Sequence, residues 1–265
     1  MASTIIGIDH LHISVLDLDA EISNYRALLN TDPVWAGLVD GKDSAVFEAG
    51  NICLWLSASE SAEGLSGICF RVDSLERHRR RMYNLTMDLE VDALEDPLVF
   101  LAGLGGSGRL DRLATACARG LAVSFVARDD TRALLRPSRI FGLDHLVISS
   151  SSPEATAFFL AARMGLELRM DLSREDWGAR FMFYRCGDLI IETYQPLQDN
   201  QTRDSDSLLG LSWRTNNADK SRADLAERSF DVSDVEEGRK VGTKVFTVRD
   251  RTAGVPTIVL QANTG

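Results

Sequence analysis

Two nearly identical segments constrain the fold of this chain more than any other feature. Residues 7–11 read Gly-Ile-Asp-His-Leu, and residues 142–146, in the second half of the chain, read Gly-Leu-Asp-His-Leu. A second pair of similar segments follows at a comparable distance in each copy, at 50–54 and at 187–191. Repetition on this scale predicts that the chain is built from copies of one supersecondary unit.

Each copy is predicted to contain a strand that carries the histidine, then a helix, then three further strands. In the second copy Pro153 suits a first helical turn and Gly165 suits a helix end. The strands that follow are expected at 166–172, 180–186 and 188–195. In the first copy we expect the helix at 19–29 and the strands at 34–38, 44–48 and 51–57.

Two weaker copies begin at 67–72 and at 210–215, each with a strand before a polar helix. The last copy is expected to continue with strands at 230–235, 243–249 and 256–261. The sequence therefore predicts an α+β chain of four tandem βαβββ modules. Modules 1–62 and 63–135 form an N-terminal pair (1–135), modules 136–205 and 206–265 form a C-terminal pair (136–265), and a hinge lies near 136–138.

Composition limits the partners of the chain. The formal net charge of −10 and the sequence pI near 4.9 repel phosphate backbones and acidic membrane surfaces, so we expect no nucleic acid and no membrane partner. No apolar stretch reaches the roughly 18 residues of a membrane span. The four cysteines show no C-x-x-C spacing. We expect a cytoplasmic protein with a small-molecule substrate, and a homodimer remains an open possibility.

The segments at 144–148 (Asp-His-Leu-Val-Ile) and 187–192 (Gly-Asp-Leu-Ile-Ile-Glu) resemble the vicinal oxygen chelate superfamily, which includes glyoxalase I, bleomycin-resistance proteins and extradiol dioxygenases. The resemblance covers nearly the whole chain, through short motifs. It implies that modules pair into cupped, half-barrel mixed sheets with flanking helices. It also implies a metal held by a His of a first strand and a Glu of a last strand. Those positions are His145 and Glu192 in module three, but His10 and Trp55 in module one.

The residue types are chemically suited to that role. Strand alternation places His145 and Glu192 each on a face with apolar neighbours. An unpaired carboxylate there costs several kcal/mol, so a metal, an arginine or a protonated histidine is expected beside it. Imidazole and carboxylate together suit Fe, Mn, Ni or Zn. A simpler interpretation is that Asp144 and His145 form a hydrogen-bonded pair and that Glu192 lies at an exposed strand edge.

The metal interpretation predicts three ligands, His145, Glu192 and His10, with Glu192 also serving as the catalytic base. If modules pair in chain order, only His145 and Glu192 share the second cleft, while the first offers His10, with His12 two residues on as a further candidate. Pairing of modules one and three would join all three ligands. Modules two and four contribute none, because their equivalent positions cannot bind a metal: Gly67, Gly210, Phe125 and Val259.

A second motif competes with this interpretation. Residues 103–108 read Gly-Leu-Gly-Gly-Ser-Gly, which matches the dinucleotide-binding pattern G-x-G-x-x-G. They follow the apolar run 98–101 and precede an expected helix at 109–118. The strand expected at 122–127 ends near Asp129 and Asp130, where such a unit places its ribose-binding acid. Because the flanking segments read as antiparallel repeats, we interpret the loop as an insertion in module two that could act as a lid.

Other charged segments are weaker candidates. The basic run 77–81 is interpreted as the solvated face of a helix that balances nearby acids. The segment 238–240 is interpreted as a turn. We expect the substrate cleft to be lined by Tyr184, Arg180, Tyr194 and Trp213.

Two functions follow from these features. The first is a dioxygenase or glyoxalase-like lyase whose divalent metal binds vicinal oxygens of a small substrate, with aromatic compounds among the candidates. The alternative is a metal-free binding protein of the bleomycin-resistance type. Its apolar cleft would be lined by Trp55, Trp177, Phe183 or Trp213.

Overall fold

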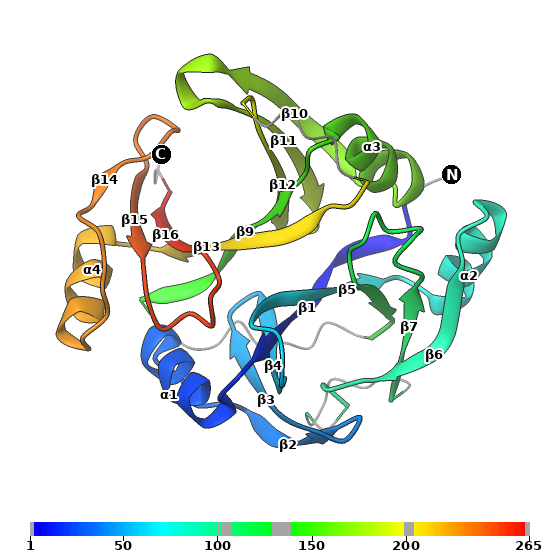
Figure 1. Cartoon of the computed structure of the whole chain (residues 1–265), viewed down its shortest axis with the longest axis horizontal. Coiled ribbons are helices and arrows are strands. Elements are labelled where there is room, and N and C mark those ends of the chain that lie inside the picture. Colours follow the sequence, from blue (N-terminus) through cyan, green and yellow to red (C-terminus); the bar gives the residue numbers. More distant parts are fainter. Residues whose placement is uncertain (1–2, 100, 102–107, 129–138, 199–203, 263–265) are drawn as a thin grey trace. The chain divides into compact units, whose positions relative to one another are not determined.

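The computed structural model describes residues 3–99, 101, 108–128, 139–198 and 204–262, and its strands form two eight-stranded mixed sheets (Figure 1). The first sheet has the order β2 (Trp35–Val39), β3 (Lys42–Ala49), β4 (Ile52–Ala58), β1 (Ile5–Val15), β5 (Gly64–Val72), β8 (Val123–Val126), β7 (Arg109–Leu113), β6 (Leu89–Glu95). The second has the order β10 (Glu167–Arg174), β11 (Ala179–Cys186), β12 (Leu189–Pro196), β9 (Ile140–Ser149), β13 (Ser207–Thr215), β16 (Thr257–Gln261), β15 (Lys244–Val248), β14 (Glu236–Glu237).

Helices follow the first strand of every module. They are α1 (Leu18–Leu29), α2 (Leu75–Asn84), α3 (Pro153–Ala157) with its π-helical continuation η1 (Phe158–Arg163), and α4 (Ala218–Glu227), and a 3-10 turn, η2 (Glu175–Trp177), precedes β11. In modules two and four the first strand pairs in parallel with the last, as β5 does with β8 and β13 with β16. Parallel neighbours require a crossover connection. The predicted α+β architecture of four tandem βαβββ modules is confirmed.

Each long helix begins where the sequence supplies a capping side chain. Asp17 accepts from the backbone N–H of Ala20 at 3.0 Å at the start of α1. Asn217 accepts from the N–H of Lys220 at 2.9 Å at the start of α4, and Ser74 caps α2 in the same way. In modules one, two and four a polar cap after the first strand therefore fixes the point at which strand changes to helix.

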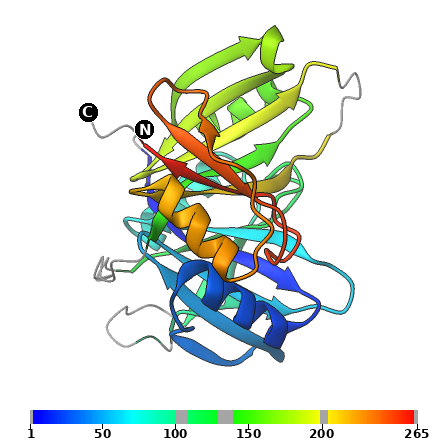
Figure 2. The same ribbon diagram turned by 90° about the vertical axis from the view of Figure 1, so that its left-hand side faces the viewer.

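The chain divides into two compact units. Unit 1 contains Met1–Leu11, Ser66–Thr131 and Leu146–Leu209, so it holds most of modules two and three. Unit 2 contains His12–Leu65, Arg132–His145 and Gly210–Gly265, so it holds most of modules one and four. Within unit 2, α1 and α4 lie side by side (Figure 2). In the described part of the chain no helix has the length and apolar character that a membrane span requires.

Most predicted elements are found within a few residues of their expected bounds, but two are wrong. Residues 109–118 form β7 and a turn instead of a helix. Leu110 and Leu113 have helical spacing, but pairing of β7 with both β6 and β8 decides the structure. Residues 230–235 form no strand beyond an isolated bridge of Val232 to Val248. The glycine-rich loop lies outside the described residues except for Gly108.

The helix of module three changes its geometry part-way along. Its second half is π-helical, and the N–H of Met164 donates to the carbonyl of Phe159, five residues earlier. This wider turn buries Phe159 and Leu160 and leaves Phe158 57% exposed, against the guanidinium of Arg163. Phe158 therefore lies outside the buried face of this helix.

The basic run 77–81 lies on α2 as predicted, but only part of it is solvated. Arg79 donates to both oxygens of Asp111 at 2.8 Å, which is the expected balance with nearby acids. His78, in contrast, is fully buried, with its Nδ1 2.7 Å from the hydroxyl of Thr4. Burial lowers the pKa of His78 to about 4, so this side chain is neutral in the folded protein at pH 7.

Candidate functional site

The second Asp-His segment lies on β9, in unit 2. Asp144 Oδ2 is 2.9 Å from His145 Nδ1, and Asp144 Oδ1 accepts a hydrogen bond from Arg214 Nε, on β13, at 3.1 Å. The three side chains are 26%, 17% and 29% exposed for Asp144, His145 and Arg214. The carboxylate is therefore held at both oxygens, and the imidazole ring is oriented while it stays accessible.

The electrostatics of Asp144 favour this arrangement. Burial alone would raise its pKa, but the hydrogen bond and charge of His145, followed by those of Arg214, outweigh burial and lower the pKa. The ionised carboxylate is a strong acceptor for a proton on His145 Nδ1. Histidines that bind metals through Nε2 commonly have their Nδ1–H on a carboxylate in this way.

Glu192 lies on β12, in unit 1, in a half-buried and aromatic environment. The strand alternates between buried Ile191 and Thr193 and the partly exposed side that carries Glu192. Phe183 on β11 is its direct cross-strand partner, and Phe181 is that of Tyr194. Aromatic rings continue along this face. Their centroid separations are 6.4 Å for Phe181 and Phe183, 5.7 Å for Phe181 and Tyr194, and 5.9 Å for Trp177 and Phe181.

The strand register places the residues predicted to line the cleft on two different faces of β11 and β12. Arg180 and Tyr184 alternate with Phe181 and Phe183 along β11, so they lie on the opposite face of the strand from Glu192. Arg180 binds Asp171 at 2.9 and 2.7 Å and Glu154 at 2.5 Å, and Tyr184 is fully buried in the core. In unit 2, Trp213 is also fully buried. Of the predicted cleft residues, Tyr194 shares the face of Glu192.

The first Asp-His segment, in unit 1, has the same Asp-His contact in a closed environment. Asp9 Oδ2 is 2.9 Å from His10 Nδ1, and Asp9 Oδ1 is 3.2 Å from Arg128 Nε. Arg128 also binds Asp96. The exposed fractions of Asp9, His10, Asp96 and Arg128 are 2% or less.

This cluster includes donor atoms of the types that bind metals. One ligand atom each from Asp9, His10 and Cys69 lies within 4.8 Å of the others. However, the guanidinium of Arg128 already pairs with Asp9. Burial, and then the charge of Asp9, raise the pKa of the Cys69 thiol well above its usual range, and this opposes formation of the thiolate that a metal requires. The first copy therefore already contains its own cation.

Comparison with known proteins identifies the fold. No protein-family profile and no curated protein sequence matches this chain. The Mn(II)-bound glyoxalase from Novosphingobium aromaticivorans matches with a TM-score of 0.71 and 16% identity, over 98% of this chain and 83% of that one. A mutant 4-hydroxymandelate synthase from Streptomyces coelicolor matches with a TM-score of 0.68 and 13% identity, over 100% of this chain and 95% of that one. A halotolerant catechol dioxygenase matches with a TM-score of 0.68 and 12% identity, over 98% of this chain and 87% of that one.

This chain has the vicinal oxygen chelate fold. All three matching structures are members of that superfamily, and the resemblance noted in the repeated motifs is confirmed at the level of the fold. Each neighbour matches over at least 98% of this chain, so the fold extends across all four modules.

The position of module one that corresponds to Glu192 is filled by an aromatic stack. Trp55 on β4 stacks on His12, with ring centroids 4.1 Å apart and planes inclined by 20°. His12 Nε2 is 2.6 Å from the hydroxyl of Ser57. Trp55 is 8% exposed, so its ring is buried, while His12 is partly exposed. Module one therefore lacks a carboxylate at the position where module three has Glu192.

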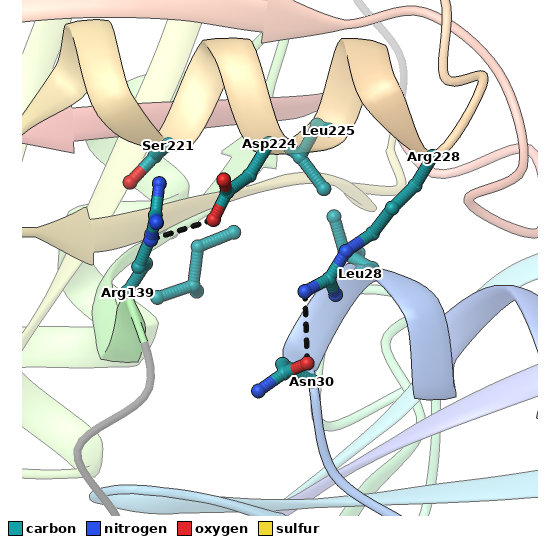
Figure 3. Close-up of a pocket in the computed structure, with 8 residues that line it drawn as sticks. Leu28, Asn30, Arg139, Ser221, Asp224, Leu225 and Arg228 are labelled. Atoms are coloured by element: carbon teal, nitrogen blue, oxygen red, sulfur yellow. Dashed lines mark hydrogen bonds and ion pairs between the residues drawn. The ribbon is translucent and has the colours of Figure 1, made fainter.

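A pocket of about 260 Å³ lies in unit 2 between α1 and α4, and no sequence pattern indicated it (Figure 3). Arg139 binds Asp224 at 2.6 Å and Arg228 donates to Asn30 at 2.9 Å. Both arginines also donate to backbone carbonyls, at 2.9 and 2.7 Å. The pocket is lined by Leu28, Asn30, Arg139, Ile140, Ser221, Asp224, Leu225 and Arg228. These arginines join the ends of packed elements, which is a structural role.

Sequence reasoning missed Arg214 and Arg128. A signal for Arg214 was present, because modules two and four carry an arginine at the same place in their opening strands, at Arg71 and Arg214. Arg128 has no such counterpart. Asp129, Asp130 and the hinge at 136–138 lie outside the described residues, and 238–240 falls, as expected, in the connection between β14 and β15.

Proposed function

We propose that this chain is a metal-dependent enzyme of the glyoxalase or dioxygenase kind, acting on a small oxygenated substrate with residues of module three. The observation that carries the proposal is the Arg214–Asp144–His145 arrangement, which orients a partly exposed imidazole as in metal-binding histidines. The shared fold with a Mn(II)-bound glyoxalase and a catechol dioxygenase supports it.

In this proposal His145 and Glu192 hold the ion. Imidazole nitrogen and carboxylate oxygen suit Mn, Fe, Ni or Zn. A bound divalent ion supplies Lewis acidity, which polarises the substrate oxygens. Asp144 fixes the orientation of the His145 ring. Glu192, as the carboxylate on an aromatic face, is the residue that accepts a proton from the substrate.

The aromatic face around Glu192 favours a second candidate, a metal-free protein that binds an apolar compound. Phe183, Tyr194 and Trp177 are partly exposed and offer ring surface for such a ligand, and buried Phe181 packs against all three rings. In that case Glu192 would lie beside the ligand without a metal. Metal binding separates the two candidates.

The test is metal analysis of the full chain purified without chelator and then loaded with Fe, Mn, Ni or Zn. The variants are His145→Ala and Glu192→Gln, and the matched control is Glu167→Gln, whose side chain is 61% exposed on β10. We expect the wild type and the control to bind one of these metals and both site variants to lose it. Equal metal content in all four proteins would contradict the proposal and favour the metal-free candidate.

A further inference from the structure

We infer that Arg214 is a positioning residue for His145 and that it acts through Asp144. The inference rests on the proposed function, in which His145 binds the metal. Arg214 Nε holds Asp144 Oδ1 at 3.1 Å, and the other oxygen, Oδ2, lies 2.9 Å from His145 Nδ1. The three groups form a chain from a guanidinium on β13 to an imidazole on β9.

The position of Asp144 explains why it needs a second contact. Neighbouring side chains on a strand point to opposite faces, so Asp144 must bend back to reach His145. Asp144 is 26% exposed, and water competes for its oxygens. A planar guanidinium bound to Oδ1 restricts rotation of the carboxylate and keeps Oδ2 on the ring.

A related arrangement occurs in the first half of the chain, where the arginine comes from a different place in the sequence. Asp9 Oδ2 lies 2.9 Å from His10 Nδ1, and Asp9 Oδ1 forms an ion pair with Nε of Arg128, which follows β8, at 3.2 Å but without hydrogen-bond geometry. The repeat counterpart of Arg214 is Arg71, on β5. In each half an arginine from a different element therefore lies against the aspartate of the Asp-His pair. This indicates that the pair itself requires a cation.

The two copies differ in what the oriented histidine can reach. His10 is 2% exposed, whereas the side chain of His145 is 17% exposed. Orientation of the ring can therefore serve ligand binding in the second copy. Losing a partner of this kind typically weakens metal binding by about 10- to 100-fold. A lysine at 214 would keep the charge but lose the planar donor, so an intermediate loss is expected.

The experiment compares the full-length wild type with Arg214→Gln, Arg214→Lys and Asp144→Asn. The matched control is Arg249→Gln, which breaks another arginine–aspartate pair of unit 2, 3.2 Å from Asp231. Mn²⁺ binding is measured by calorimetry. In the metal-free proteins, ¹⁵N NMR of labelled histidine reports which ring nitrogen of His145 carries the proton, a readout that loss of stability alone does not change.

Two results support the inference. Mn²⁺ binding should weaken by about 10- to 100-fold in Arg214→Gln and Asp144→Asn but not in the control. The Nδ1–H form of His145 should dominate in the wild type and lose that dominance in both variants. An unchanged Mn²⁺ affinity and an unchanged His145 tautomer in Arg214→Gln would overturn the inference. This holds also if the substrate KM alone rises, because Arg214 would then bind the substrate directly.

Failure of the proposed function gives a different pattern. If the wild type binds no Mn²⁺, or if His145→Ala binds it as tightly as the wild type, the metal site is wrong. The tautomer comparison then still decides the role of Arg214. A shifted tautomer supports positioning of His145, and an unshifted one overturns it.

Discussion

Replacing Arg128 by methionine should lower the free energy of unfolding by about 3–5 kcal/mol, the usual cost of removing one partner from a buried ion pair. Arg128 is 2% exposed, and Asp9 and Asp96 are 0% exposed. Methionine fills much of the space of the arginine stem but leaves both carboxylates buried without the guanidinium. In contrast, the side chains of the ion pair between Arg249 and Asp231 are 55% and 59% exposed, so this pair contributes about 0–1 kcal/mol to the free energy of unfolding.

The assay is urea denaturation of the wild type, Arg128→Met and Arg249→Gln at pH 7, with slopes compared to verify that the transitions expose similar surface. Adding Asp96→Asn to Arg128→Met should recover part of the loss, because it removes one buried charge. A loss in Arg128→Met no larger than that in Arg249→Gln would refute the reasoning that this guanidinium is the cation of the first copy.

Three further predictions concern other parts of the chain. Because the pKa of His78 is lowered to about 4, the unfolded chain takes up a proton below pH 6.5 that the folded protein refuses, so stability falls as the pH drops from 6.5 towards 4. In His78→Gln the free energy of unfolding, measured by denaturation, should fall by about 3 kcal/mol less over this pH range than in the wild type. Identical pH profiles of the two proteins would contradict the burial argument. Asn217→Ala should cost about 1 kcal/mol in thermal unfolding through loss of the α4 cap, and an unchanged melting temperature would be against it. Arg180→Gln should leave Mn²⁺ affinity within about twofold of the wild type, since Arg180 lies on the opposite face from Glu192, and a loss as large as that of Glu192→Gln would count against the observed register.

The fold was largely accessible from the sequence because its signals are local and repeated. The twin Asp-His segments and the recurring strand and helix pattern predict four modules, and capping side chains such as Asp17 and Asn217 mark where the helices begin. Failures came where long-range pairing outweighs local spacing. Leu110 and Leu113 resemble a helical face, but two neighbouring strands determine the conformation of β7.

The candidate site was accessible only in part. The Asp-His pairing follows from adjacent residues, and both copies show it at 2.9 Å. The arginine partners come from segments far away in sequence, so spacing could not reveal them. The cleft lining also depended on register, because a shift of one residue moves Tyr184 from one face of β11 to the other.

The central claim is that module three binds a divalent metal through His145 and Glu192. Anomalous diffraction from a crystal of the full chain soaked in Mn²⁺ tests it most directly. The account predicts one strong peak with His145 Nε2 and a Glu192 oxygen each at about 2.0–2.2 Å. A peak at Asp9, His10 and Cys69 instead, or no peak at His145, would contradict it.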